Sequence, residues 1–403
     1  MAHIVAIGAG QAGSSLVAKL RNSGFDGKVT LIGAEPHPPY QRPPLSKKYL
    51  LGDMPLDRLY LRPEKFYREN DITLRLDQPI TKIDPNTRCI FLDNEVISYD
   101  ELALTTGSVP RLLPASIGGA LDGVHVVRSL SDVDAMAPRF DAKARILIVG
   151  GGYIGLEAAA VAATKGLEVT LVEMADRILQ RVAAPQTSDF FRNLHQLHGV
   201  DIREGVGLER LFGTDAVTGA ALTDGSELAV DFVIAGVGVT PATDLAEQAG
   251  LEIDNGIKTN VLGQSSDPHI WAAGDCASLP YRGRQIRLES VQNAIDQAEI
   301  VAKNMLGGNQ PYHPMPWFWS DQYDVKLQIA GLNSGYDRVV TRPGEKDGAV
   351  SFWYYNKTSL LAVDAANDPR AYMIGKRLIE AKKSPAPQVI EDSKTDLKAL
   401  LKP

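Results

Sequence analysis

The sequence is poor in cysteine and has no long apolar run. Cys89 and Cys276 are its only cysteines, and they form no C-x-x-C motif. Flavin enzymes that reduce disulfides need a close cysteine pair, so this chemistry is excluded, and a reducing cytoplasm is favoured. No stretch approaches the roughly 20 apolar residues that a membrane-spanning helix needs. No charged-then-apolar leader precedes the first predicted strand, which begins by His3. We therefore expect a cytoplasmic protein without a membrane segment.

Positive charge is also scarce. The 403 residues include 42 Lys and Arg against 49 Asp and Glu, a net charge of −7, which argues against a nucleic-acid partner. Only seven histidines occur, and none has cysteine or acidic companions at metal-ligand spacing, so we assign no metal. His195 and His198 are expected to be solvated or capping residues. The length suffices for two or three domains, each with its own core.

Residues 145–173 carry the motif around which the chain is organised. The apolar run at 146–149 predicts a parallel strand buried on both faces, and the segment 153–164 has the spacing of a helix with one buried face. A second strand, at 169–172, follows the helix. The glycines between the first strand and the helix have the spacing G-x-G-x-x-G, and an acid ends the second strand: Gly150, Gly152, Gly155 and Glu173.

Each glycine of this motif has a mechanical reason. The first permits a tight turn, the second lets the backbone approach a pyrophosphate, and the third brings helix and strand together. The N-terminus of the helix then faces the phosphates, and the carboxylate of Glu173 is placed to accept hydrogen bonds from both ribose hydroxyls. We predict a dinucleotide site here, with Tyr153 and Ile154 among its cofactor-binding residues.

The chain contains the same arrangement once before. Residues 4–35 run from an apolar strand through three glycines and a helix to a second strand followed by Glu35. The glycines of this first copy are Gly8, Gly10 and Gly13. Two dinucleotide sites in one chain suggest one bound flavin and one exchangeable nicotinamide.

Two loops supply further candidates. The proline-rich segment 36–44 predicts an ordered loop before a short helix at 45–50. Lys47 in that helix is either a solvated lysine or a cation beside a flavin ring, where it stabilises the charge that hydride acceptance creates. Thr106 and Gly107 follow a predicted strand and form either a simple turn or a close backbone approach to a ligand.

Two later stretches extend this set. Gly274 and Asp275 follow the predicted strand 270–272, and the carboxylate either holds flavin ribityl hydroxyls or caps a helix. The helix predicted from Glu289 to Asn304 directs its positive N-terminal end towards the flavin, and the small residues around Gly238 suit a close approach to a cofactor. Residues after Pro314 predict a small domain with an antiparallel sheet, with strands at 326–330, 338–341, 349–355 and 360–363 and helices at 369–381 and 394–401.

Taken together, these motifs resemble a known family. Over nearly its whole length the sequence is similar to the flavin-containing ferredoxin reductases of bacterial oxygenases, the putidaredoxin reductase and biphenyl dioxygenase reductase group of the glutathione-reductase-like superfamily. The glycine motifs and AAGD are common to the superfamily, whereas RPPLSK and WFWSDQY point to the ferredoxin-reducing branch. The matching stretches are GAGQAG at 8–13, RPPLSK at 42–47, TTG at 105–107, GGGYIGLE at 150–157, AAGD at 272–275, ESVQNA at 289–294 and WFWSDQY at 317–323.

The resemblance implies an α/β fold with two Rossmann-like dinucleotide-binding domains, for FAD and NADH, and a small α+β C-terminal domain. The FAD domain is expected to be discontinuous, at 1–110 and 241–316. The NADH domain is expected at 111–240 and a C-terminal interface domain at 317–403.

The resemblance also implies roles for individual residues. Lys47 is expected to pair with Glu157 near flavin N5 as the catalytic pair, since a buried lysine or glutamate each needs its opposite. Without such a pair, Glu157 is a simple acid on a helix face. Trp319 is expected near the flavin or the partner surface rather than only in a core, and Arg42 and Val291 complete the expected cofactor-binding residues.

The activity implied is hydride transfer from NADH to FAD, followed by single-electron transfer to a small [2Fe–2S] ferredoxin that feeds a monooxygenase or dioxygenase. Glu173 favours NADH because a carboxylate repels the 2′-phosphate of NADPH, although Arg177 and Arg181 lie nearby. The alternatives are a reductase of rubredoxin or of a small molecule, and an NADH-sensing redox interaction protein. We expect a monomer or weak dimer.

An acidic ferredoxin requires a basic docking surface on an otherwise acidic chain. The candidate residues for this surface are Arg282, Arg284, Arg287, Lys326 and Arg338. The alternative is that these charges are scattered and only keep the protein soluble.

Overall fold

The computed structural model describes residues 2–402. The chain divides into two compact units, each assembled from three separate segments. The first unit holds the residues up to Arg42, Pro55–Val109 and Val239–Pro316. The second holds Pro43–Met54, Pro110–Gly238 and the chain from Trp317 onwards. The three-domain division expected from the sequence stays a prediction.

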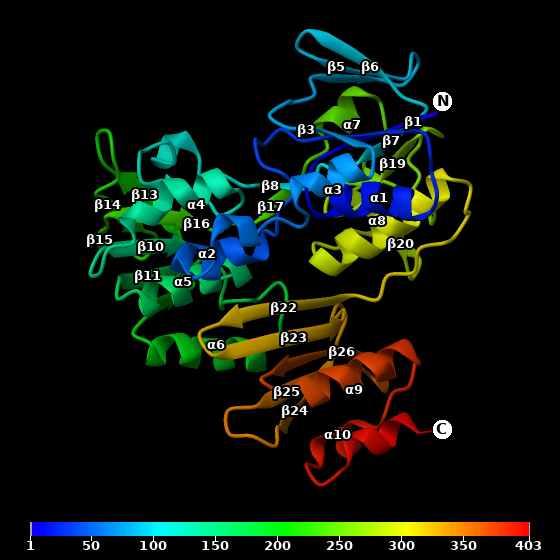
Figure 1. The fold of residues 1–403 in the computed structure, drawn as a ribbon. Helices are drawn as coiled ribbons and strands as arrows, with labels where there is room; N and C mark the ends of the chain where they lie inside the picture. Colours follow the sequence, from blue (N-terminus) through cyan, green and yellow to red (C-terminus); the bar gives the residue numbers. More distant parts are fainter. Residues whose placement is uncertain (1, 403) are drawn as a thin grey trace. The chain divides into compact units, whose positions relative to one another are not determined.

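A parallel five-stranded sheet forms the centre of the first unit (Figure 1). Its strand order is β19-β7-β1-β2-β3, and all neighbours run parallel. Apolar residues occupy consecutive positions in β1 and β2 because both faces of the sheet are covered. The strands are β1 (His3–Ile7), β2 (Lys28–Ile32), β3 (Ile72–Arg75), β7 (Glu101–Leu104) and β19 (Ile270–Ala272).

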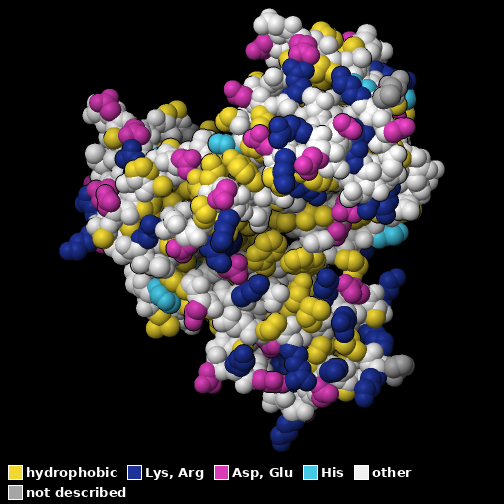
Figure 2. Space-filling model, in the orientation of Figure 1, with side chains coloured by type: hydrophobic (Ala, Val, Ile, Leu, Met, Phe, Trp, Pro, Cys, Tyr) yellow, Lys and Arg dark blue, Asp and Glu magenta, His cyan; other side chains and the backbone are white. Residues whose placement is uncertain are grey.

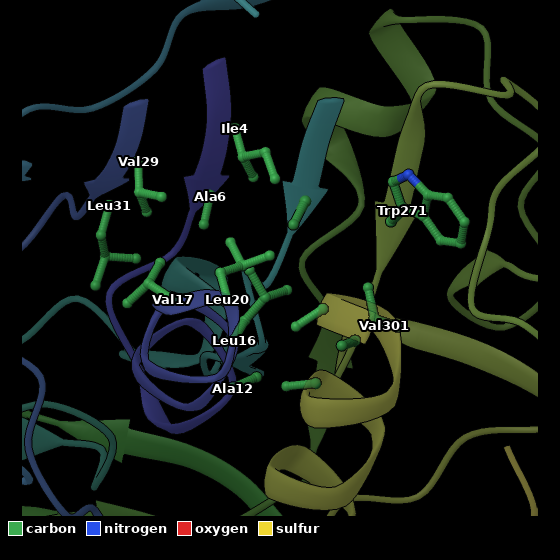
Figure 3. Packing of buried hydrophobic residues seen from close by; sticks show 14 of the residues in the cluster. Ile4, Ala6, Ala12, Leu16, Val17, Leu20, Val29, Leu31, Trp271 and Val301 are labelled. Atoms are coloured by element: carbon green, nitrogen blue, oxygen red, sulfur yellow. The ribbon is translucent and has the colours of Figure 1, made fainter. Parts of the chain in front are cut away.

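Helices α1 (Gln11–Asn22) and α8 (Val291–Met305) lie side by side against one face of this sheet. Figure 3 shows Leu16 and Leu20 of α1 directed at the strands, with Val301 of α8 beside them. All three side chains are fully buried, and burying one such side chain contributes about 1.5–3 kcal/mol. This packing holds the N-terminus of α1 at the carboxyl ends of the strands, where the first glycine loop lies.

Smaller elements complete the first unit. Helix α7 and the strands β6, β8, β17, β18, β20 and β21 were not predicted, because such short elements carry little periodicity. Most predicted strands and helices of this unit are found within a few residues of their expected bounds. The elements are η2 (Leu56–Arg58), α3 (Glu64–Glu69), β4 (Lys82–Asp84), β5 (Cys89–Leu92), β6 (Glu95–Ser98), β8 (Ser108–Pro110), β17 (Val239–Pro241), α7 (Asp244–Gln248), β18 (Ile257–Lys258), β20 (Ala277–Tyr281) and β21 (Arg284–Ile286).

A second parallel sheet, of order β12-β11-β10-β16-β9, forms part of the second unit. Helix α5 lies at the bounds predicted from the glycine motif. The predicted helix at 45–50 is divided into a 3₁₀ turn and one helical turn. The elements are η1 (Pro43–Ser46), α2 (Lys48–Leu51), η3 (Ala115–Ile117), β9 (Val124–His125), α4 (Leu130–Met136), η4 (Ala137–Arg139), β10 (Arg145–Val149), α5 (Tyr153–Thr164), β11 (Glu168–Glu173), α6 (Pro185–Leu197), β12 (Asp201–Glu204), β13 (Leu208–Phe212), β14 (Gly219–Leu222), β15 (Glu227–Ala229) and β16 (Phe232–Ala235).

The second unit also contains an antiparallel sheet of order β22-β23-β26-β25-β24, which helix α9 covers. Strand β22 was not predicted as a strand, and the last predicted helix is a short 3₁₀ segment. The α/β fold class with an α+β C-terminal part is confirmed. The elements are β22 (Trp317–Gln322), β23 (Val325–Gly331), β24 (Arg338–Pro343), β25 (Val350–Asn356), β26 (Ser359–Ala366), α9 (Pro369–Glu380), α10 (Pro387–Glu391) and η5 (Leu397–Leu401).

Membrane-spanning helices are not found. Between residues 2 and 402, every helix is too short or too polar to cross a bilayer.

Candidate functional site

The first glycine loop packs so tightly that two of its glycines have no room for a side chain. A Cβ added at Gly8, where φ is +111°, would lie 2.2 Å from the carbonyl oxygen of Thr105. One added at Gly13 would lie 2.1 Å from the carbonyl oxygen of Gly8. By contrast, a Cβ at Gly10 would meet nothing within 4 Å, although Gly10 is the N-cap residue of α1. The loop therefore leaves open space at the N-terminus of a helix.

The second glycine loop repeats this geometry in the other unit. A Cβ at Gly150 (φ +110°) would lie 2.4 Å from the carbonyl oxygen of Gly236, and one at Gly155 would lie 2.1 Å from that of Gly150. Gly152, the N-cap residue of α5, again faces open space. Helix N-termini attract phosphate groups, and here the backbone can approach without steric hindrance. Both loops thus fit a dinucleotide pyrophosphate.

Glu35, which follows β2, and Glu173, which ends β11, have different surroundings. Glu35 accepts hydrogen bonds from the guanidinium of Arg42 and the hydroxyl of Tyr40, both at 2.5 Å. Glu173 accepts from the backbone N–H of Gly151 through Oε2 and of Ala175 through Oε1, both at 2.8 Å. Glu173 is therefore held against the glycine loop by backbone donors.

The guanidinium of Arg177 is directed towards Ser188, where Nη1 donates to Oγ at 2.6 Å. It also donates through Nη2 to the carbonyl oxygen of Gln180 at 3.5 Å. Arg181 is exposed. The first of these two arginines thus has one partner in helix α6 and one in its own loop.

Several predicted residues of the first unit meet near the N-terminal ends of α1 and α8. Ser108 donates to a carboxylate oxygen of Asp275 at 3.2 Å, and Gly274 is so close to α1 that an added Cβ would lie 3.0 Å from that of Ala12. The turn after Asp275 leads into strand β20, so the alternative of a helix N-cap is wrong.

Thr106 and Gly107 form a turn, and helix α8 begins close to its predicted start. Thr106 donates to the carbonyl oxygen of Ala242 at 2.7 Å, and Gly107 has a φ of +73°. Helix α8 begins at Val291, after the N-cap Ser290, whose hydroxyl accepts from the backbone N–H of Asn293. The turn at 105–107 is thus tied to the segment that follows β17.

In the second unit, Lys47 and Glu157 form a buried ion pair. Lys47 Nζ lies 2.7 Å from Glu157 Oε2, with side-chain exposures of 15% and 5%. Lys47 also donates to the carbonyl oxygen of Pro43 at 3.3 Å. Glu157 is not a simple acid on a helix face, because its side chain is turned into the protein.

Two serines that sequence reasoning missed hold the same carboxylate. Ser46 donates to Oε2 of Glu157 and Ser320 donates to Oε1, each at 2.7 Å. Both serines are buried. The sequence could have indicated both serines, because Ser46 lies in RPPLSK and Ser320 lies in WFWSDQY, the two motifs specific to the ferredoxin-reducing branch. Both motifs contact the glutamate of GGGYIGLE.

Strand β22 explains how one motif reaches both α5 and α6. Alternate residues of a strand point to opposite faces. On one face, Phe318 packs on the ring of Tyr153 with 5.0 Å between centroids, Ser320 reaches Glu157, and Gln322 bonds to His195 at 2.8 Å. The phenol oxygen of Tyr153 is buried and has no hydrogen-bond partner among residues 2–402.

The opposite face of β22 carries Trp317 and Trp319, with 5.6 Å between their ring centroids. Lys376 lies over the ring of Trp317. Both tryptophans are only partly buried, so Trp319 is not simply a core residue.

The prediction for His195 is wrong, because this residue is fully buried between α6 and β22. Burial lowers its pKa to about 4. His198 is exposed and is the C-cap residue of α6, as predicted, with its Nδ1 2.9 Å from the carbonyl oxygen of Leu194. The two histidines differ because His195 lies on the face of the amphipathic helix that packs on the sheet.

Two other predicted site residues and the two cysteines remain. Ile154 is exposed in the first turn of α5, and Gly238 has a φ of +102° in the segment between β16 and β17. Cys89 and Cys276 are both free thiols. Within residues 2–402, no three His, Cys, Asp or Glu side chains gather as metal ligands.

The fold and the paired loops define a two-dinucleotide oxidoreductase. In agreement, residues 2–298 match the family described as pyridine nucleotide-disulphide oxidoreductase, and residues 317–401 match the family described as reductase C-terminal. The chain belongs to the pyridine nucleotide-disulphide oxidoreductase family and carries the reductase-type C-terminal region.

Within this family, the chain is similar to several ferredoxin reductases. The chain is 41% identical to the ferredoxin–NAD(P)⁺ reductase of a Sphingomonas species, over 98% of this chain and 95% of that one. The ferredoxin reductase for the CYP199A2 system of Rhodopseudomonas palustris has a TM-score of 0.96 at 38% identity, with 100% of both chains covered. Putidaredoxin reductase in its covalent complex with putidaredoxin has a TM-score of 0.95 at 38% identity, over 99% and 98% of the two chains.

Proposed function

We propose that the protein is a cytoplasmic, NADH-dependent, FAD-containing ferredoxin reductase. The observation that carries this proposal is the meeting of the two narrow motifs at one buried carboxylate, with Lys47 and Ser46 from RPPLSK and Ser320 from WFWSDQY bound to Glu157. The names of the relatives, which are reductases of ferredoxins, support the same activity.

FAD is assigned to the first unit. The open space at Gly10 would receive its pyrophosphate at the N-terminus of α1, while Glu35, held by Arg42, would accept from the adenosine ribose. Asp275, held by Ser108, would bind hydroxyls of the ribityl chain. The remaining residues proposed to line this site are Gly8, Gly13, Thr106, Gly107, Gly274 and Val291.

NADH is assigned to the second unit. Gly152 would receive the pyrophosphate of NADH at the N-terminus of α5, and Glu173 would accept from the ribose hydroxyls. A 2′-phosphate would meet the negative charge of Glu173, and the guanidinium of Arg177 already binds Ser188. These features favour NADH over NADPH. The remaining residues proposed for this site are Gly150, Tyr153, Ile154, Gly155 and Gly238.

When bound, FAD supplies the conversion of a two-electron hydride into single electrons for an iron–sulfur acceptor. The ammonium of Lys47 would supply a fixed positive charge to offset the negative charge that a bound flavin ring would gain on reduction. Glu157 holds the ammonium in place, and the hydroxyls of Ser46 and Ser320 keep the carboxylate oriented. Trp319, on the opposite face of β22, is proposed to lie towards the flavin or the partner.

The partner proposed is a small [2Fe–2S] ferredoxin with an acidic surface. Residues 317–403 contain 13 Lys and Arg against 11 Asp and Glu, whereas the whole chain has a net charge of −7. Figure 2 shows many Lys and Arg side chains over the region of α9, α10 and β24. Such a local positive surface attracts an acidic partner.

The predicted basic residues are divided between the two units. Arg282, Arg284 and Arg287 lie in the first unit, and Lys326 and Arg338 lie in the second. Arg287 pairs with Glu289, and Arg338 lies 3.7 Å from Glu391. Lys326 and Arg338 are exposed and are the docking residues we propose.

The test is anaerobic mixing of the purified yellow protein with NADH and a [2Fe–2S] ferredoxin from the same source. We expect the flavin to bleach and the ferredoxin to be reduced at a rate comparable to ferricyanide. Rubredoxin is the matched control, and its reduction in preference to the ferredoxin would support a different acceptor. Bleaching without reduction of either protein would support the NADH-sensing alternative.

A further inference from the structure

A chain of hydrogen bonds leads from Glu157 through β22 to α6. Ser320 Oγ donates to Glu157 Oε1 at 2.7 Å, and Gln322 Nε2 donates to Ser320 Oγ at 3.2 Å. His195 Nε2 lies 2.8 Å from Gln322 Oε1, and the hydroxyl of Tyr323 lies 3.2 Å from His195 Nδ1. All five residues belong to the second unit.

Every hydrogen in this chain points towards Glu157. The Oε1 atom of Gln322 can only accept, so the proton between Gln322 and His195 belongs to His195 Nε2. The imidazole is neutral, because burial lowers its pKa to about 4. Its Nδ1 atom must then accept, and the hydroxyl of Tyr323 donates to it.

The chain is dry along most of its length. Ser320, Gln322 and His195 are at most 1% exposed. In such surroundings successive hydrogen bonds polarise one another, and an aligned series directs its positive end to the terminal acceptor. Here the terminal acceptor is a carboxylate oxygen, so the aligned donors favour one orientation of the Glu157 side chain.

The two oxygens of this carboxylate are held from different sides. Oε2 receives Lys47 and Ser46 from the segment 43–47, whereas Oε1 receives Ser320. Rotation of the carboxylate away from Lys47 would therefore break the bond to Ser320. The orientation of Glu157 towards Lys47 therefore depends on the series of hydrogen bonds as well as on the two charged residues.

We propose that Ser320, Gln322 and His195 are positioning residues that hold Glu157 in the orientation required for its ion pair with Lys47. This proposal rests on the proposed function of that pair, since it gives the three positioning residues a role in hydride transfer. The charged and titratable groups that face His195 are Tyr323, from the end of β22, and His198 of its own helix.

The series of hydrogen bonds is tested by NMR on the full-length holoprotein with ¹⁵N-labelled histidine. We expect His195 to be a neutral imidazole with its proton on Nε2 between pH 8 and about 5, since its pKa is about 4. The Gln322→Leu variant should lose this single-tautomer signature, because Nε2–H then has no acceptor. A wild-type His195 that carries its proton on Nδ1, or that titrates at the ordinary value for histidine, would overturn the chain.

The positioning role is tested by the rate of anaerobic flavin reduction by NADH and by the midpoint potential of the bound flavin. A hydrogen bond to a charged group contributes enough that Ser320→Ala should slow reduction about tenfold and lower the potential. Ser320→Thr, which keeps the hydroxyl, should restore both. Gln196→Ala is the matched control, since Gln196 is exposed on the same helix, and its rate should stay within about twofold of wild type.

The two levels of failure can be separated. If wild-type protein is not reduced by NADH, the proposed function fails while the NMR result still decides whether the chain exists. If wild type is reduced and Ser320→Ala has the same rate and potential, the positioning role is wrong. If Ser320→Ala does not fold, the Gln322→Leu variant decides: a slow rate together with the loss of the His195 signature supports the role, and a normal rate despite that loss overturns it.

Discussion

The ammonium of Lys47 lies 2.7 Å from Oε2 of Glu157, and this ion pair is largely shielded from water. Removing one member leaves the other charge buried, which typically costs about 3–5 kcal/mol of stability. Replacing both members by apolar residues avoids that cost. The pair therefore allows the folding contribution of these residues to be separated from the catalytic contribution that we propose for them.

We predict that Glu157→Leu lowers both the stability and the rate of flavin reduction by NADH. The double variant Lys47→Met with Glu157→Leu should regain most of the stability but remain slower than wild type by about 10²-fold, because no cation offsets the developing charge. Chemical unfolding and stopped-flow reduction measure the two effects. A double variant that is stable and also fast would show that the pair is only structural.

The second prediction separates the two dinucleotide sites. Gly10→Ala and Gly152→Ala each add a Cβ where nothing lies within 4 Å, so both variants should fold. The added methyl group would instead obstruct an approaching pyrophosphate. We expect Gly10→Ala to lose FAD, and Gly152→Ala to keep FAD but to need at least about tenfold more NADH for half-maximal reduction.

Flavin absorbance and NADH titration measure these two effects. Gly24→Ala is a control for stability alone: it also adds a Cβ in open space at the end of α1, away from the loop, but its φ of +83° strains the added side chain, so it should lose stability and keep FAD. The reverse pattern, with FAD lost from Gly152→Ala, would exchange the two assignments.

The third prediction concerns the choice of nicotinamide coenzyme. Glu173→Arg removes the negative charge next to the ribose site and adds a positive one, so the preference for NADH over NADPH should fall at least about tenfold. Arg177→Gln should change the preference little, because its guanidinium already binds Ser188. The ratio of kcat/KM for the two coenzymes is the measurement, and an unchanged ratio in Glu173→Arg would remove Glu173 as the selector.

The fourth prediction follows from Asp364, whose side chain is fully buried and accepts from Thr187 and Tyr354. Burial raises its pKa from the ordinary value to about 6. The folded state therefore binds a proton more tightly than the unfolded state, so this residue contributes stability at acid pH that is lost as the pH rises from about 4 to about 6. His195 has the opposite sign, because its lowered pKa makes stability fall as the pH drops from 6.5 to about 4.

The two groups thus partly offset each other between pH 4 and 6. In Asp364→Asn only the contribution of His195 remains, so we expect stability to fall more steeply on acidification than in wild type. Urea unfolding at a series of pH values measures this slope. Asp368→Asn is the control, because Asn also caps helix α9 at that position. A wild-type slope in Asp364→Asn would contradict the expectation.

The fifth prediction concerns the docking surface. Reversing the charge of Lys326 and Arg338 together should slow ferredoxin reduction several-fold at low salt, and the effect should shrink as salt screens the attraction. Reduction of ferricyanide should not change. Lys143→Glu is the control, since it also reverses an exposed charge of the second unit. Equal losses in all variants would mean that total charge, not these two positions, sets the rate, and no loss would mean that these charges only keep the protein soluble.

The sequence by itself determined the two nucleotide loops and the α/β class. The glycines of both loops have local reasons, since a positive φ and a close backbone contact each exclude a side chain, as Gly8 and Gly150 show. The helix that follows the second loop was predicted to the residue, because an apolar strand, a glycine turn and a helical spacing stand next to one another in the chain. Such signals depend on neighbours along the sequence.

Only the tertiary structure decided which groups surround Glu157. Ser46 lies 111 residues before it and Ser320 lies 163 residues after it, and no spacing rule connects hydroxyls over such distances. Strand β22 was missed for a related reason. One of its faces packs on α5 and α6 and includes polar residues, whereas the other carries the two partly buried tryptophans. Neither face is therefore simply apolar or simply exposed, and the pattern of a half-buried strand is absent. The burial of His195 follows from that strand, because a histidine on a helix becomes an interior residue only when another element covers it.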